Sequence, residues 1–201
     1  MKVLLLSKNL SDGEAVSEYV KNLAEYLVSE NNEVTIVSFD DESYYSIDDR
    51  VNVNRFPLNF EGDNLYNWSM MMNNEMKGQV VEETDVEEFD IIHAHDWTTV
   101  PGAVSLSKQF ETAFVLTIHS TENERGFGSE ESEVISELEW QGTFEADKVI
   151  VNRDETRNSV LFDLDAPEEK LEMIDPLKDG WQQIILNNYR NLLDNKEQVK
   201  N

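Results

Sequence analysis

The regular alternation of short apolar runs with helix-like patterns is the feature that most restricts how this chain can fold. Runs such as KVLLLS, EVTIVS and AFVLTI are rich in leucine and β-branched residues, and the segments between them repeat apolar residues at helical spacing. This order predicts a parallel sheet with helices on both faces. We therefore expect one Rossmann-like, doubly wound α/β domain whose strands cover residues 2–7, 33–38, 51–56, 90–94, 113–118, 148–152 and 171–174.

Length and composition allow one well-buried core. The chain has 201 residues, 39% of them hydrophobic, and no cysteine. A chain without cysteine forms no disulfide and offers no thiolate as metal ligand or nucleophile. The apolar runs are too short to span a membrane, and the N-terminal KVLLL lacks the features of a signal peptide. We expect a soluble, cytoplasmic protein with a single core.

The formal charge of -26, from 42 acidic and 16 basic residues, restricts the partners of the chain. Nucleic acids and anionic membranes are bound mainly through lysine and arginine, so neither is expected as a partner. The acidic residues are spread over a chain with clear hydrophobic periodicity, which favours a folded domain over a disordered acidic segment. Concentrated salt screens the repulsion between the carboxylates of such a surface. We therefore expect that the host is halophilic; the alternative is an ordinary acidic protein.

Polar residues follow the predicted strands at the edge where an open parallel sheet binds ligands. His93 and His95 end one predicted strand, His119 follows the next, and Gly13 lies in the first strand-to-helix loop. The histidines could be hydrogen-bonded core residues, ligands of a metal together with Asp96, or part of an active site. A serine hydrolase is disfavoured because no serine lies in a G-x-S-x-G turn.

Four stretches in a fixed order make the sequence similar to a known family: DIIHAHDW, VLTIHSTENERGFG, ISELEW and FEADKVIVN. Over residues 1–176 the chain resembles the N-terminal domain of retaining, nucleotide-sugar-dependent glycosyltransferases of the glycogen/starch synthase type. The resemblance implies one half of a GT-B fold, which receives the acceptor glycan and faces a donor-binding domain across a cleft. It implies UDP- or ADP-glucose and a glucan acceptor as partners of the complete enzyme. We expect no cofactor and no resident metal.

The resemblance also implies roles for individual residues. His119 and Asp96 correspond to the catalytic positions, His119 beside the transferred sugar and Asp96 at the sugar hydroxyls. Such groups suit an oxocarbenium-like transition state, which needs positioned dipoles and carboxylates more than a strong nucleophile. Gly13 corresponds to the loop that approaches the donor phosphates, although the adjacent Asp12 carboxylate is unfavourable there.

The remaining candidate substrate-binding residues are His95, Trp97, Glu122, Arg125 and Arg153. For each of them a structural role is the alternative. Trp97 could stack on a sugar or pack in the core, and Glu122 and Arg125 could contact the substrate or form a solvated charge cluster. Arg153 could face an anion at the strand ends. We expect Glu139 and Trp140, in the middle of a predicted helix, to pack against the core.

The chain departs from the family after residue 176, where a second Rossmann domain would begin. It continues instead into WQQIILNNYRNLLDN, a predicted helix with Trp181, Ile185 and Tyr189 at helical spacing. This segment resembles the C-terminal helix that returns to the N-terminal domain in full-length relatives. We expect a domain over 1–176, a returning helix within 177–201, and no intervening donor domain. The chain is then an acceptor-side half, inactive without the missing donor domain, or a non-catalytic glycan-binding or assembly module. An engineered excision, a natural single-domain form and half of a split enzyme are the alternative origins of such a chain.

Overall fold

A computed structural model describes residues 1–58, 60, 62–83, 89–126 and 130–200. Its sheet has seven strands in the order β3-β2-β1-β4-β5-β6-β7, and every neighbouring pair is parallel. The strands are β1 (Lys2–Ser7), β2 (Glu33–Phe39), β3 (Asn52–Phe56), β4 (Ile91–His95), β5 (Ala113–Ile118), β6 (Lys148–Val151) and β7 (Leu171–Met173). The predicted doubly wound parallel sheet is confirmed, with strand ends shifted by at most one residue.

The central strands are apolar on both sides because helices cover both faces of the sheet. In β1, Leu4 and Leu6 belong to the core on one face, whereas Val3 and Leu5 belong to the core on the other. This explains why β1, β4 and β5 have continuous apolar sequences instead of alternating ones. The edge strand β3 is only partly buried and does alternate.

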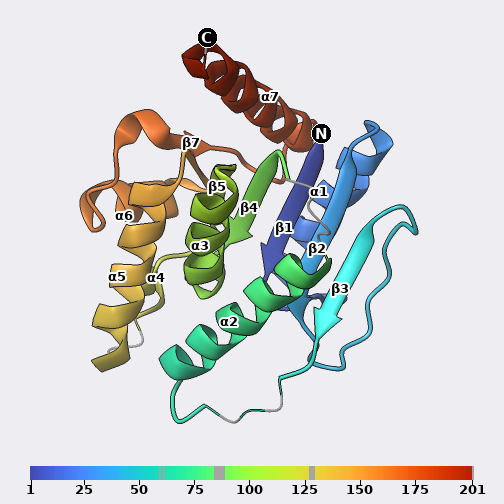
Figure 1. Cartoon of the computed structure of the whole chain (residues 1–201). Coiled ribbons are helices and arrows are strands. Elements are labelled where there is room, and N and C mark those ends of the chain that lie inside the picture. The colour runs from blue at the N-terminus through green and yellow to red at the C-terminus, as the bar shows by residue number, and fades with distance from the viewer. Residues whose placement is uncertain (59, 61, 84–88, 127–129, 201) are drawn as a thin grey trace.

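The helices divide between the two faces of the sheet (Figure 1). One face is covered by α1 (Ala15–Ser29) and α7 (Trp181–Lys200). The opposite face carries α2 (Leu65–Glu83), α3 (Val100–Phe110), α5 (Glu130–Glu145) and α6 (Asp154–Phe162). Short helical turns complete the chain: α4 (Glu122–Arg125), η1 (Trp97–Thr99) and η2 (Glu168–Lys170). None of the helices in the described ranges is long and apolar enough to cross a membrane.

The C-terminal helix packs back on the domain, as predicted. Trp181, Ile185 and Tyr189 are 7%, 0% and 0% exposed and join the core beneath α1. Trp181 stacks on Tyr19 of α1, with 4.4 Å between the ring centroids. The predicted range 177–201 starts before the helix, and Asn201 lies outside the described residues.

The strand order places a crevice at the carboxyl edge of the sheet. Chain connections run from β1 outward to β2 and β3, and then return to β4 on the other side of β1. The loops that follow β1 and β4 therefore diverge, and this is where open α/β sheets bind ligands.

Candidate functional site

A cavity of about 320 Å³ opens at this switch point. The loop after β1 and the start of α1 supply one wall, and the end of β4 with η1 supplies the other; α2 and α4 each add one residue. The lining residues are Lys8, Asn9, Glu14, Val16, Leu65, His95, Asp96, Trp97, Thr98 and Arg125. Four predicted site residues thus meet at one place, and the sequence analysis missed Asn9, Glu14 and Thr98.

Asp96 has the most constrained backbone at the cavity. Its φ of 59° and ψ of 169° form a combination that residues other than glycine rarely adopt, at a cost of about 1–3 kcal/mol. Two hydrogen bonds hold it in place: its N–H donates to the Thr117 carbonyl (2.9 Å), and its Oδ1 accepts the His119 N–H (2.8 Å). The carboxylate is therefore fixed at the cavity wall.

His93 is a structural residue behind this wall. Its Nδ1 lies 2.5 Å from the Tyr189 hydroxyl on α7, and its Nε2 lies 2.7 Å from the Thr117 hydroxyl on β5. The side chain is completely buried, and burial lowers the pKa of His93 to about 3. His93 is therefore neutral and connects the C-terminal helix to the sheet.

His95 and His119 form an oriented pair. The Asn152 side-chain nitrogen lies 2.9 Å from Nδ1 of His119 and donates to it, so the proton of His119 is on Nε2. Nε2 of His119 lies 3.4 Å from Nδ1 of His95, which leaves the proton of His95 on its own Nε2. That buried nitrogen has no hydrogen-bond partner among the described residues. Burial lowers the pKa of both rings, so both are neutral at pH 7.

These three stacked histidines and their partners form what we call the histidine cluster; the partners are Tyr19, Thr117, Asn152 and Tyr189. Tyr19 packs edge-on against His119 at 4.8 Å between ring centroids. Its helical spacing makes Tyr19 look like any core residue in the sequence, which is why its contact with the site was missed. Across the described ranges, no group of three or more histidine, cysteine or carboxylate side chains could hold a metal ion.

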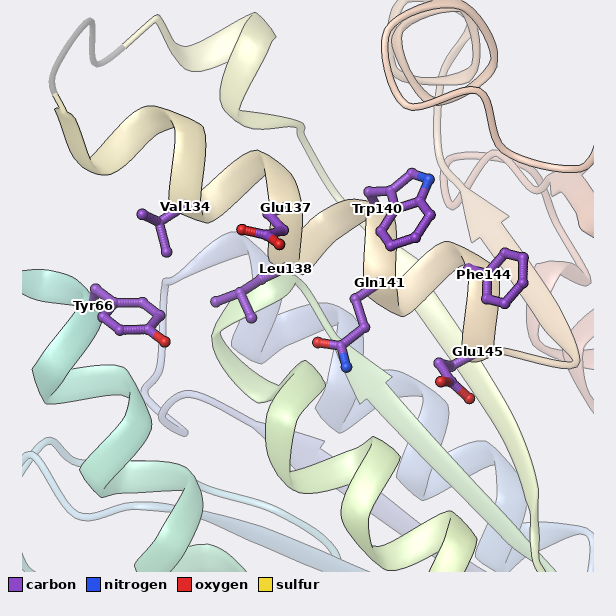
Figure 2. A pocket seen from close by; sticks show the side chains of 8 residues that line it. All are labelled: Tyr66, Val134, Glu137, Leu138, Trp140, Gln141, Phe144 and Glu145. Atoms are coloured by element: carbon purple, nitrogen blue, oxygen red, sulfur yellow. The ribbon is translucent and has the colours of Figure 1, made fainter.

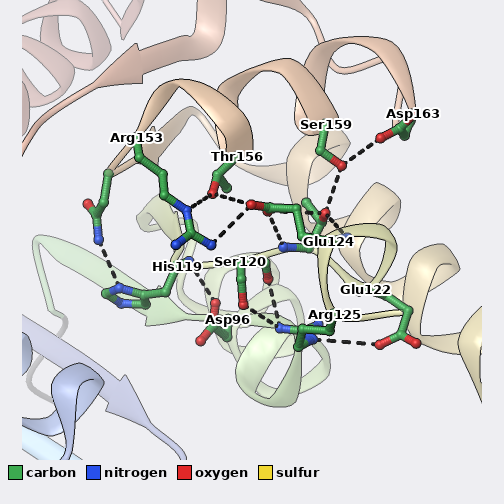
Figure 3. A network of polar contacts seen from close by, with 12 residues as sticks. Asp96, His119, Ser120, Glu122, Glu124, Arg125, Arg153, Thr156, Ser159 and Asp163 are labelled. Carbon is green, nitrogen blue, oxygen red and sulfur yellow. Dashed lines mark hydrogen bonds and ion pairs between the residues drawn. The ribbon is translucent and has the colours of Figure 1, made fainter. Parts of the chain in front are cut away.

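A second group of residues, which we call the ion-pair cluster, consists of Glu122, Arg125 and Glu139; Figure 3 shows Glu122 and Arg125. Arg125 donates to Glu139 (2.7 Å) and lies 3.6 Å from Glu122. Glu139 also accepts the Glu122 N–H in both carboxylate oxygens, at 2.8 and 3.0 Å. Glu122 is 2% and Glu139 1% exposed, so the alternative of a solvated charge cluster is wrong. Burial raises the pKa of Glu139 to about 7.

Arg153 lies outside the residues that line the cavity. It precedes α6, and its guanidinium contacts Glu124 (3.1 Å) and the Thr156 hydroxyl (3.0 Å). Glu124 closes the capping box of α4 with Thr121. Arg153 thus connects α4 to α6 (Figure 3). Its side chain is half exposed.

Gly13 likewise lies beside the cavity and does not line it. It has a φ of 84°, and its N–H donates to Glu18 (3.0 Å). The adjacent Asp12 is paired with Lys21, whose hydrogen bond lowers the pKa of Asp12. The Lys21 ammonium group on α1 therefore balances the negative charge that argued against this loop.

The two tryptophans near the site behave differently from each other. Trp97 is 5% exposed and packs against Ile135 and Leu138 of α5, with part of its surface on the cavity. Trp140 is 47% exposed, so the prediction that it packs against the core is wrong. The helix directs Glu139 inward and Trp140 outward. The sequence did not indicate which of these two neighbours would be buried.

Comparisons with known proteins identify the family and the fold of the chain. The family model described as Glycosyltransferase Family 4 matches residues 16–176. An uncharacterized glycosyltransferase of Methanocaldococcus jannaschii is 32% identical over 161 residues, which are 78% of this chain and 40% of that protein. The chain thus spans well under half the length of this relative.

Two solved structures illustrate the shared fold. A sucrose-phosphate synthase chain from Thermosynechococcus elongatus, designated 27_220_406_426, has a TM-score of 0.69 and 19% identity, covering 96% of this chain and 99% of that one. The catalytic domain of starch synthase IV from Arabidopsis thaliana, bound to ADP and acarbose, has a TM-score of 0.60 and 12% identity, covering 87% of this chain and 51% of that one. The seven-stranded domain is one Rossmann-like half of a GT-B fold, and the chain belongs to glycosyltransferase family 4.

Proposed function

We propose that this chain is the acceptor-side half of a retaining glycosyltransferase that moves glucose from UDP- or ADP-glucose to an α-glucan. The observation that supports this most strongly is the cavity at the switch point. There a fixed carboxylate, Asp96, lies beside a buried imidazole, His95, whose Nε2 has no partner among the described residues. A carboxylate acceptor and an unused N–H donor suit the hydroxyl groups of a neutral sugar.

The neutral state of His119 suits the proposed reaction. Transfer with retention passes through a positively charged, oxocarbenium-like transition state. A protonated imidazole beside that charge would oppose it, whereas a neutral ring contributes a fixed dipole. Burial lowers the pKa of His119, and Asn152 fixes its orientation. Asp96 adds a negative charge that becomes more favourable as the sugar becomes positive.

The chain by itself is poorly equipped to bind the nucleotide diphosphate. Arg125 is paired with Glu122 and Glu139, and Arg153 is paired with Glu124, so their charges are already balanced. Lys8 is a further basic residue, and it lines the cavity. The overall charge of -26 repels an anionic donor. We therefore propose that a separate donor domain supplies these contacts.

Two observations support residue 176 as the point after which the donor domain is missing. The family match ends at residue 176, and a turn capped by Asp175 links β7 to α7 there. The designation 27_220_406_426 of the similar sucrose-phosphate synthase chain is consistent with two joined segments, and that chain is covered almost completely by this one.

A transfer assay tests the proposal. The purified chain is incubated in molar KCl with UDP- or ADP-glucose and maltoheptaose, with and without the part of the Methanocaldococcus jannaschii relative that this chain does not match, added as the proposed donor domain. We expect no useful turnover from the chain alone and turnover when the donor domain is added. Rapid transfer by the chain alone would contradict the half-enzyme proposal. Glycan binding without turnover under any condition would favour the alternative, a non-catalytic glycan-binding module.

We further propose that the acidic surface adapts the protein to a halophilic cytoplasm. At about 1 M salt the screening length is only about 3 Å, so carboxylates on the surface cease to repel one another. Circular dichroism over a KCl series should show a rise in melting temperature between about 0.1 and 2 M. An unchanged melting temperature would make the acidic surface incidental.

A further inference from the structure

A second cavity, of about 440 Å³, lies between α2 and α5 (Figure 2). Tyr66 of α2 stands at one end, and Trp140 and Phe144 of α5 stand toward the other. The residues that line this α2–α5 groove are Tyr66, Val134, Glu137, Leu138, Trp140, Gln141, Phe144 and Glu145. The groove has no role in the sugar-transfer chemistry described above.

Two aromatic rings are exposed in the groove. Trp140 is 47% and Phe144 58% exposed, and their rings stack with 5.6 Å between centroids. Lys170 occupies a position over the Phe144 ring, 5.7 Å from its centroid. Large aromatic side chains gathered in an open groove on a soluble protein indicate a binding surface.

The polar groups of the groove favour a neutral, hydroxyl-rich ligand. Glu137, Gln141 and Glu145 contribute carboxylate and amide groups, and Glu145 also accepts a hydrogen bond from Lys108 (2.6 Å). None of the described lining residues is basic, and the two lysines beside the groove are engaged, Lys108 with Glu145 and Lys170 with the Phe144 carbonyl, so the groove favours a neutral ligand over an anion. Aromatic rings that contact C–H faces, together with carboxylates that accept from hydroxyls, are complementary to a sugar chain.

The groove is adjacent to the cavity at the switch point. Trp97, Ile135, Leu138 and Tyr66 pack into one small cluster. Trp97 lines the first cavity, and Leu138 and Tyr66 line the groove. A single layer of side chains therefore separates the two, and Leu65, which precedes Tyr66, lines the first cavity. A ligand that fills both cavities would have to extend past this layer.

We propose that the α2–α5 groove is a second carbohydrate-binding site, which holds the remote units of a linear, neutral α-glucan whose end lies in the cavity at Asp96. This inference rests on the proposed function for the identity of the glycan. Two linked subsites raise the affinity for a long chain without changing the affinity for a short one. The groove thus selects acceptors by length.

Each of the two cavities is lined by one of the four tryptophans of the chain, Trp97 in the first cavity and Trp140 in the groove. Indole N–H resonances of ¹⁵N-labelled protein in molar KCl are followed while maltose or maltoheptaose is added. Trp97 reports the first cavity and Trp140 reports the groove. We expect maltose to shift Trp97 alone and maltoheptaose to shift both. Trp140→Ala should weaken maltoheptaose binding at least tenfold and leave maltose binding unchanged, whereas the control Phe162→Ala, at an 80% exposed position of α6, should change neither.

The outcomes separate the groove from the proposed function. A Trp97 shift without a Trp140 shift would overturn the proposal that the groove binds glucan, but it would not contradict the proposed function. A Trp140 shift with a silent Trp97 would overturn the proposal that one glucan chain occupies both cavities, and it would also count against the first cavity as a sugar site. Equal maltoheptaose affinity in Trp140→Ala and the unaltered protein would also overturn the proposal. Two further titrations test other occupants of the groove: a higher protein concentration tests a second copy of the chain, and added oligolysine tests a cationic partner. A Trp140 shift in one of these titrations but not with maltoheptaose would also overturn the proposal.

Discussion

The histidine cluster and the ion-pair cluster lie near one another behind the candidate cavity, and they keep buried polar groups stable in different ways. The histidines are neutral because burial lowers their pKa values, and their ring nitrogens are ordered by Tyr189, Thr117 and Asn152. The ion-pair cluster keeps the charge of Arg125 and balances it with two carboxylates. One cluster depends on hydrogen bonds from distant elements, and the other depends on charge pairing between α4 and α5.

This difference determines how each cluster fails. The histidine cluster is connected to α7 through Tyr189 and, through Tyr19, to Trp181. In the described ranges, the charged groups of the ion-pair cluster pair with one another on α4 and α5, so the cluster should be insensitive to α7. Loss of one charge partner, by contrast, leaves a buried ion, which costs more than a missing neutral hydrogen bond.

Removal of α7 should have the largest effect. Deleting residues 177–201 removes Trp181, Ile185 and Tyr189, and the loss of one such buried anchor costs about 3–5 kcal/mol. The total stability of a domain is only about 5–15 kcal/mol, so we expect loss of cooperative unfolding in a circular dichroism melt. A truncated chain with an unchanged melting temperature would refute the role of α7.

Arg125→Met should be the most damaging single change in the ion-pair cluster. It leaves Glu122 and Glu139 buried without their cation, which we expect to lower the free energy of unfolding by about 3–5 kcal/mol in urea titrations at pH 7.5. Arg157→Met, which breaks an exposed pair with Glu168, is the matched control and should cost less than about 1 kcal/mol. Similar losses in the two variants would show that the cluster is not stabilised by pairing.

Tyr189→Phe should have a smaller effect on the histidine cluster. The ring remains to fill the core, but Nδ1 of His93 loses its partner, at a cost of about 1–3 kcal/mol. Tyr44→Phe, at a 77% exposed position, serves as control and should leave the unfolding free energy unchanged. If both variants unfold at the same urea concentration, the contact of α7 with His93 contributes nothing to stability.

The two clusters should respond to acid in opposite directions. The histidines have lower pKa values in the folded state than in the unfolded state. Their contribution to the free energy of unfolding is therefore complete above about pH 6.5 and is lost as the pH falls toward the pKa values of the folded state. Glu139 has a raised pKa of about 7, so its contribution is complete below pH 4.5 and is lost as pH rises through 7. Glu139→Gln should therefore steepen the loss of stability between pH 7 and 5 by up to about 1.4 kcal/mol per pH unit.

His119→Gln tests the other side of this comparison. Removing one titrating histidine should reduce the loss of the free energy of unfolding between pH 7 and 5. Urea unfolding at several pH values in molar KCl measures this loss. Parallel pH profiles for the unaltered protein and both variants would show that these groups do not set the acid response.

The sequence predicted the strands well because each depends on a local apolar run, and it placed the histidines because strand ends converge by topology. It could not predict that Arg125 pairs with Glu139, since that contact joins separate helices across the fold. It also could not tell that Trp140 turns outward, because α5 has a mixed pattern in which neighbouring residues face core and solvent. Tyr19 and Tyr189 lie at helix positions that look purely apolar, so their contacts with histidines were invisible before the fold was known.

The most direct test of the central claim is sugar binding by Asp96→Asn. Asparagine keeps the side-chain oxygen that accepts the His119 N–H and tolerates a positive φ, but it removes the charge at the cavity. Maltose binding, followed through the Trp97 indole and His119 ring resonances, should be saturable in the unaltered protein. It should weaken at least about tenfold in the variant, because a hydrogen bond to a charged group contributes about 1.5–3 kcal/mol. Equal affinity in the two proteins would contradict the assignment of this cavity as the sugar site.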